Sequence, residues 1–174
     1  MSNVLIGIIG VILFIGLALA GALILGDDFR SSNAEAKAAA ISSMMQQSAQ
    51  AINMYQLKTG KVLPSAYAGD YATFIGPRFI KTTPVNPVNG MGFLVTHQGG
   101  GHDASPAVLI YTSLGNDASA KAVCKAIEDM AGTVDTEAAV QPTSYAARTA
   151  ANRRFGCVNN AGYPGGMYQA YIPI

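Results

Sequence analysis

The hydrophobic pattern is strongest at the start of the chain, where residues 4–26 contain no proline and no charged or polar side chain. A helix of this length, at about 1.5 Å per residue, crosses the roughly 30 Å hydrocarbon core of a bilayer. The run lacks the basic front and the small-residue cleavage site of a secretory signal. We therefore expect a membrane helix over residues 1–26. Asp27 and Asp28, just beyond it, favour an outside location for the rest of the chain.

Small residues interrupt this run. Glycines stand at positions 7, 10, 16, 21 and 26, and Ala18, Ala22 and Gly26 follow one another at intervals of four residues. Such a row lets helices approach closely in an apolar medium, which indicates an assembly interface. Glycine and alanine are also common in ordinary membrane anchors. On this stretch alone, the two interpretations have equal weight.

The helical pattern continues beyond the apolar run. Residues 27–58 contain no proline or glycine, and apolar side chains recur close to the 3.6-residue period, chief among them Phe29, Ile41, Met45, Ile52 and Tyr55. Gly60 and Pro64 end the pattern. We expect one helix over residues 2–58, whose second part packs this stripe onto a head formed by residues 59–174.

The pattern of the head predicts an α+β fold. After a proline-rich connector with a short strand at residues 93–95, residues 107–114 form the best candidate strand. A helix then begins at Asp117 or Ser119 and ends at Gly132. Residues 167–173 resemble a last strand. The helix should face inward with Ala122, Val123, Ala126, Ile127 and Met130. The predicted fold class is thus a long N-terminal helix packed on a small antiparallel sheet.

Composition narrows the function. Only 12% of residues are charged, against about 25% in typical soluble proteins, and the formal net charge of +1 gives no field to steer nucleic acid. Arg148, Arg153, Arg154 and Phe155 could form a small basic patch for DNA, but a solvated face is several times more common. We expect no nucleic-acid partner.

Motifs for catalysis or for cofactors are missing from the sequence. Ser113 lies in Tyr-Thr-Ser-Leu-Gly, which is not a nucleophile elbow, and neither a Walker loop nor a dinucleotide fingerprint occurs. His97, His102 and Asp103 lie near one another, yet a surface loop is the better interpretation than a metal site. We expect neither an enzyme nor a bound cofactor.

The chain has two cysteines, Cys124 and Cys157, both in its later half. If the head lies outside the cytoplasm, a disulfide between them is the default expectation. The chain-entropy model gives such a closure about 3–4 kcal/mol. The alternatives are two unrelated buried thiols or half of a metal site. The wide spacing of the two cysteines disfavours the metal site.

Together, the glycine-punctuated apolar helix, its amphipathic continuation, the small sheet and the late cysteine pair resemble type IV pilins and pseudopilins. The run AVLIYTSLGNDASAKAVCKAIEDM and the later Cys157-Val-Asn are similar to the type IVb branch, which includes thin conjugative pilus and toxin-coregulated pilus subunits.

The resemblance implies a structural subunit that polymerises into an extracellular helical filament of identical copies. A prepilin peptidase would trim a precursor in the inner membrane, Met1 would be the processed and methylated end, and a pilus assembly platform would extract the subunit. It leaves the filament's role open among adhesion, conjugation, DNA uptake and motility. A minor or tip pilin, or a single-span anchor carrying a binding domain, is the alternative.

In this view the filament core would be packed by apolar and small residues of the first helix, namely Leu5, Gly7, Gly10, Phe14, Gly16, Ala18, Ala22 and Gly26. The family carries a glutamate at the fifth mature position, where it is usually read as pairing with a neighbour's N-terminal amine. Leu5 removes that pairing. We hypothesise that Ser2 or Asn3 bonds the amine instead, which predicts that alanine at both positions lowers filament yield.

Overall fold

The computed structural model describes all of the chain except residues 1, 64–74, 77, 97–108, 144–154 and 164–165. The chain divides into two compact units, Met1–Asn33 and Ala34–Ile174. The fold is α+β with a long N-terminal helix, a mainly antiparallel sheet and a disulfide, as predicted.

Helix α1 runs over Ser2–Thr59, close to the predicted bounds. It ends because Gly60 adopts a left-handed conformation, with φ of +66°, that a side chain would disfavour. The Gly60 N–H donates to the carbonyl oxygen of Gln56 at 2.8 Å, and the Thr59 hydroxyl donates to the carbonyl oxygen of Tyr55 at 2.8 Å. The first bond satisfies one of the last four carbonyl groups of the helix, and the second adds a side-chain donor to its last turn.

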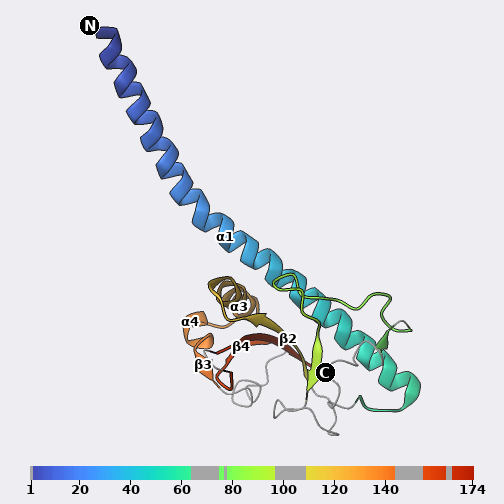
Figure 1. Ribbon diagram of the computed structural model, residues 1–174. Helices are drawn as coiled ribbons and strands as arrows, with labels where there is room; N and C mark the ends of the chain where they lie inside the picture. The colour runs from blue at the N-terminus through green and yellow to red at the C-terminus, as the bar shows by residue number, and fades with distance from the viewer. Residues whose placement is uncertain (1, 64–74, 77, 97–108, 144–154, 164–165) are drawn as a thin grey trace. The chain divides into compact units, whose positions relative to one another are not determined.

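The sheet of the second unit has the strand order β1-β2-β5-β4-β3. Its strands are β1 (Leu94–Thr96), β2 (Leu109–Gly115), β3 (Pro142–Thr143), β4 (Gly156–Asn160) and β5 (Tyr168–Pro173). Strand β2 pairs antiparallel with β1 and with β5, and β5 pairs antiparallel with β4. The two-residue β3 lies at the edge of the sheet and pairs parallel with β4. Figure 1 shows the sheet and the helices beside it.

Helix α3 (Ala118–Met130) follows β2, and the short helix α4 (Thr136–Ala139) follows α3. The Asp117 carboxylate caps α3 by accepting the Ala120 N–H at 2.7 Å. Gly132, with φ of +77°, closes the other end, where the Thr133 N–H reaches the carbonyl oxygen of Glu128 at 3.0 Å. The predicted cap and stop of this helix are confirmed.

The main core lies between one face of the sheet, α3 and the α1 residues from Ala34 onward. The other face carries a smaller apolar cluster of Leu109, Tyr111, Val158 and Tyr171. Two inward positions predicted for α3 were wrong, because Ala122 and Met130 are exposed. The buried face instead includes Ala120, Cys124 and Glu128, because Cys124 and Glu128 both bond to Cys157 and so fix the rotation of the helix.

Candidate assembly surface

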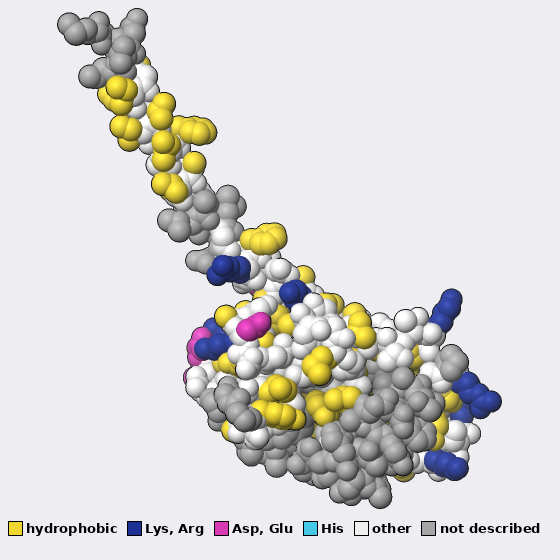
Figure 2. Space-filling view, in the orientation of Figure 1, with side chains coloured by type: hydrophobic (Ala, Val, Ile, Leu, Met, Phe, Trp, Pro, Cys, Tyr) yellow, Lys and Arg dark blue, Asp and Glu magenta, His cyan; other side chains and the backbone are white. Residues whose placement is uncertain are grey.

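The first unit presents apolar side chains on all sides of its helix. From Ile6 to Leu19 the large hydrophobic side chains are between 49% and 73% exposed, with Phe14 and Leu17 the most exposed. Figure 2 shows such side chains along the visible face of this unit. We call residues 6–20 the apolar segment. A helix that is hydrophobic all round is normally covered, by protein or by lipid.

The small residues of this segment, and Gly26 beyond it, have space around them. A Cβ added at Gly7, Gly10, Gly16 or Gly26 would meet no atom within 4 Å, leaving aside the helix's own backbone. Ala18 is exposed. Met1 and the side chains of Leu5 and Ala22 lie outside what the structure describes. Nothing in the described part of the chain therefore requires glycine at these four positions.

The second unit buries most of the predicted stripe on α1. Ile41, Met45 and Ile52 are fully buried, and the Tyr55 ring contacts the Phe79 ring edge-on with centroids 5.9 Å apart. Phe29 is the exception, with 72% of its side chain exposed. The buried stripe begins at Ala34 rather than at Phe29. The periodicity of apolar residues predicts which face of the helix is buried, but it does not predict at which residue burial begins.

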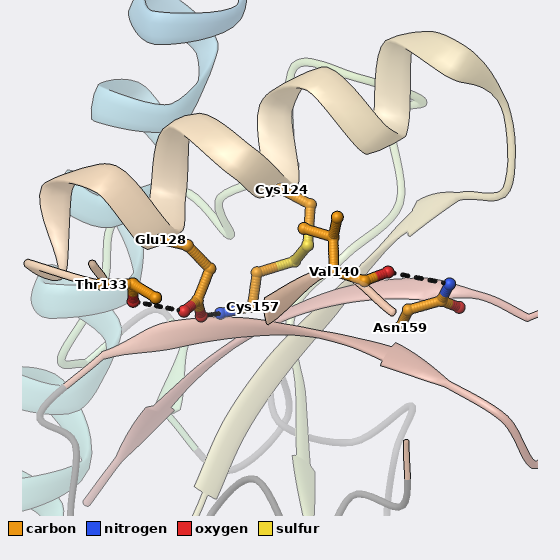
Figure 3. Close-up of a disulfide and its surroundings, with 6 residues drawn as sticks. All are labelled: Cys124, Glu128, Thr133, Val140, Cys157 and Asn159. Atoms are coloured by element: carbon orange, nitrogen blue, oxygen red, sulfur yellow. Dashed lines mark hydrogen bonds between the residues drawn. A yellow bond between two sulfur atoms is a disulfide. The ribbon is translucent and has the colours of Figure 1, made fainter. Parts of the chain in front are cut away.

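The predicted disulfide between Cys124 and Cys157 is present and joins α3 to β4, with the two Cα atoms 5.4 Å apart. One helical turn after Cys124, the carboxylate of Glu128 is completely buried. Its Oε1 accepts the backbone N–H of Cys157 at 2.6 Å, and its Oε2 accepts the Thr133 hydroxyl at 2.6 Å (Figure 3). The disulfide and the Glu128 carboxylate thus both attach β4 to α3.

A glycine makes room for this arrangement. Gly156 pairs with Tyr171 across the sheet. A Cβ at Gly156 would lie 2.8 Å from the Tyr171 hydroxyl oxygen and 2.9 Å from Glu128 Oε1. The absence of a side chain at Gly156 lets a buried tyrosine hydroxyl and a buried carboxylate occupy that space.

A second polar cluster fixes the loop before β1. Asn86 is buried, and its Nδ2 donates to Thr112 Oγ1 at 2.8 Å and to the Ser113 carbonyl oxygen at 2.9 Å. Its Oδ1 accepts the N–H groups of Val88 and Asn89 at 3.0 and 3.1 Å. The Asn86 side-chain amide thus closes the turn and joins it to β2 through hydrogen bonds.

Two ionisable groups respond to their surroundings. The Lys125 ammonium bonds Glu137 at 2.5 Å and Lys121 lies 3.3 Å from it, which lowers the pKa of this exposed carboxylate and links α4 to α3. Burial, with a smaller contribution from Tyr163, raises the pKa of Tyr111 to about 12.

All but one of the remaining candidate residues lie in segments that the structure does not describe. These residues are His97, His102, Asp103, Arg148, Arg153 and Arg154. Phe155 is partly buried and packs against the main core rather than standing on an open face.

Within the described residues, the structure has no helix whose length and hydropathy together suffice to cross a membrane.

No protein-family model, curated protein or solved structure matches the chain.

Proposed function

We propose that this chain is a structural subunit of an extracellular filament of the type IV pilus kind, which polymerises by packing its apolar segment against the same segment of other copies. The observation that carries the proposal is the unbroken exposure of large hydrophobic side chains around residues 6–20. Full burial of one such side chain is worth roughly 1.5–3 kcal/mol relative to water. A surface of this kind needs a partner.

The glycines of the apolar segment support the proposal that its partner is the same segment of other copies. Each glycine inside a helix costs about 0.5–1 kcal/mol relative to alanine. The surroundings of Gly7, Gly10 and Gly16 leave room for a side chain, so this cost has no explanation in the described part of the chain. Close approach of neighbouring helices would explain it.

The second unit supplies what the outside of a filament needs. It has its own core and a disulfide. Before assembly the subunit would reside in the inner membrane through the apolar run of residues 4–26. A prepilin peptidase and an assembly platform would then act on it. The proposal requires no catalytic group and no cofactor.

The test is electron microscopy of the sheared extracellular fraction from cells expressing the chain, with the main band identified by mass spectrometry. Filaments built of this chain are expected, beginning at a methylated Met1. Gly16→Leu should lower their yield, because the added side chain holds helices apart, whereas the control Asn53→Leu, at an exposed position of α1 outside the apolar segment, should not. A protein that stays in the membrane without filaments would favour the anchored binding domain.

A further inference from the structure

Charges on the second unit are distributed unevenly. Four exposed cations lie near the end of α1 and in the segment that packs beside it, namely Lys58, Lys61, Arg78 and Lys81. None of them has an ion pair with a described residue. Figure 2 shows one end of this unit with Lys and Arg side chains and no Asp or Glu side chain among them on the visible face, whereas at the opposite end Lys or Arg side chains lie beside the Asp and Glu side chains.

One of these cations, Lys81, lines a groove of about 440 Å³. The other lining residues include Gln47, Gln50 and Met54 from α1 and Phe79 and Ile80 from the following segment. The Lys58 ammonium lies 5.6 Å from the centre of the Phe79 ring, so one cation lies over the apolar wall. We call this feature the basic-rimmed groove. It combines apolar side chains, among them Met54, Phe79 and Ile80, with two cations, Lys81 and Lys58, that have no ion pair with a described residue.

The connection between α3 and α4 has the opposite character. Residues 129–135, which we call the acidic turn, carry Asp129 and Asp135 and no basic residue. Both carboxylates are exposed. Between them Val134 is fully exposed and Met130 is 47% exposed. The acidic turn therefore presents apolar side chains flanked by carboxylates.

We infer that the acidic turn of one copy docks in the basic-rimmed groove of another, with Val134 against the apolar side chains of the groove and Asp129 and Asp135 beside Lys81 and Lys58. We choose the acidic turn as the occupant of the groove because the charges of the two surfaces are complementary. Two different patches on one subunit make a heterologous contact, which repeats as an open helix when the rotation does not close a ring. The inference rests on the proposed function and names a second contact, between heads, in the same filament.

Crosslinking tests the contact without requiring filaments. Full-length chain in detergent micelles at low salt, half of it labelled with ¹⁵N, is treated with a carbodiimide, which joins a carboxylate to a neighbouring amine. Mass spectrometry should find Lys81 joined to Asp135 or Asp129 in peptide pairs of mixed label. The yield should fall several-fold at high salt, because salt screens exposed charges.

Charge reversal tests it in the filament. Lys81→Glu or Asp129→Lys alone should lower both the crosslink yield and the yield of sheared filaments about tenfold or more, since like charges would then meet. Asp129 is chosen over Asp135 because the Asp135 carboxylate caps α4 by accepting the Ala138 N–H at 2.9 Å. The double variant should recover most of both, and the control Lys37→Glu should leave both near the wild-type value.

The outcomes separate the two proposals. Filaments with no mixed-label crosslink and no effect of charge reversal would overturn the docking contact and leave the filament function standing. A crosslink sensitive to charge reversal, without filaments, would support the contact and count against the function. Loss of binding to anionic lipid vesicles in Lys81→Glu, with no crosslink between copies, would assign the groove to a membrane surface and overturn the contact.

Discussion

Glu128 and Cys157 are joined by a hydrogen bond of 2.6 Å from the backbone N–H of Cys157 to Oε1 of the buried carboxylate (Figure 3). The same strand residue forms the disulfide to Cys124, one turn earlier in the same helix. A carboxylate that loses water on burial needs such donors to offset the cost. The pairing of α3 with β4 therefore depends on a charge-assisted hydrogen bond as well as on the covalent bond.

Replacing Glu128 tests that dependence. Glu128→Ala should lower the free energy of unfolding by about 2–5 kcal/mol, because it leaves the Cys157 N–H buried without its acceptor and opens a cavity. Glu128→Gln keeps an acceptor oxygen and should cost less. Urea unfolding of the full chain in detergent, followed by the near-ultraviolet circular dichroism of tyrosine, measures both. An effect no larger than that of the exposed control Asp129→Ala would contradict this account.

Gly156 should tolerate no side chain. In Gly156→Ala the new methyl group would overlap the Tyr171 hydroxyl and Glu128 Oε1, and relief requires one buried polar group to move. We expect a loss of about 1–3 kcal/mol in the same unfolding measurement.

The matched control for that substitution is Gly92→Ala, where an added Cβ meets no atom within 4 Å. This control should be neutral or slightly stabilising, because alanine restricts the unfolded chain more than glycine does. Equal stabilities of the two alanine variants would show that the space at Gly156 is not needed.

Asn86 gives a nearly isosteric test of the loop cluster. Asn86→Asp keeps the oxygen that accepts from Val88 and Asn89 but loses the amide donor to Thr112 and Ser113. We expect a loss of about 2–4 kcal/mol, because the buried Ser113 carbonyl oxygen would then face a carboxylate. Protease cleavage between residues 84 and 92 should also accelerate. The exposed control Asn53→Asp should change neither measurement.

Stability should decline at high pH through Tyr111. Burial raises its pKa from 10.0 to about 12, so the folded state disfavours the phenolate. The stabilisation is complete below pH 10 and is lost as the pH rises through about 12. The total corresponds to roughly 2–3 kcal/mol. Tyr111→Phe should flatten this decline in unfolding curves measured across that range, and an unchanged decline would show that other groups cause it.

Patterns that are local in sequence predicted the fold well. The helical period located α1 to within a residue at its end, and the Asp117 cap and Gly132 stop bounded α3. The apolar, β-branched run of residues 107–114 identified β2, which extends one residue further, to Gly115. Each of these signals is read from neighbouring residues, so no tertiary contact had to be known.

Features set by distant contacts escaped prediction. Strand β4 has the sequence Gly-Cys-Val-Asn-Asn, which resembles a loop, and it is a strand because β5 pairs with it and Glu128 binds Cys157. Ala122 and Met130 were assigned to the wrong face of α3 because the prediction used hydrophobicity alone, which does not predict that a glutamate is buried. The one available signal was the spacing of Cys124 and Glu128, four residues apart on one helix face.

The apolar segment is the centre of the proposed function, and a helical reconstruction of sheared filaments by cryo-electron microscopy tests it most directly. The account predicts that residues 6–20 of each copy pack against the same residues of neighbouring copies along the filament axis, with the disulfide-bonded units outside. Filaments in which this segment contacts no other copy, or filaments built from another protein, would contradict it.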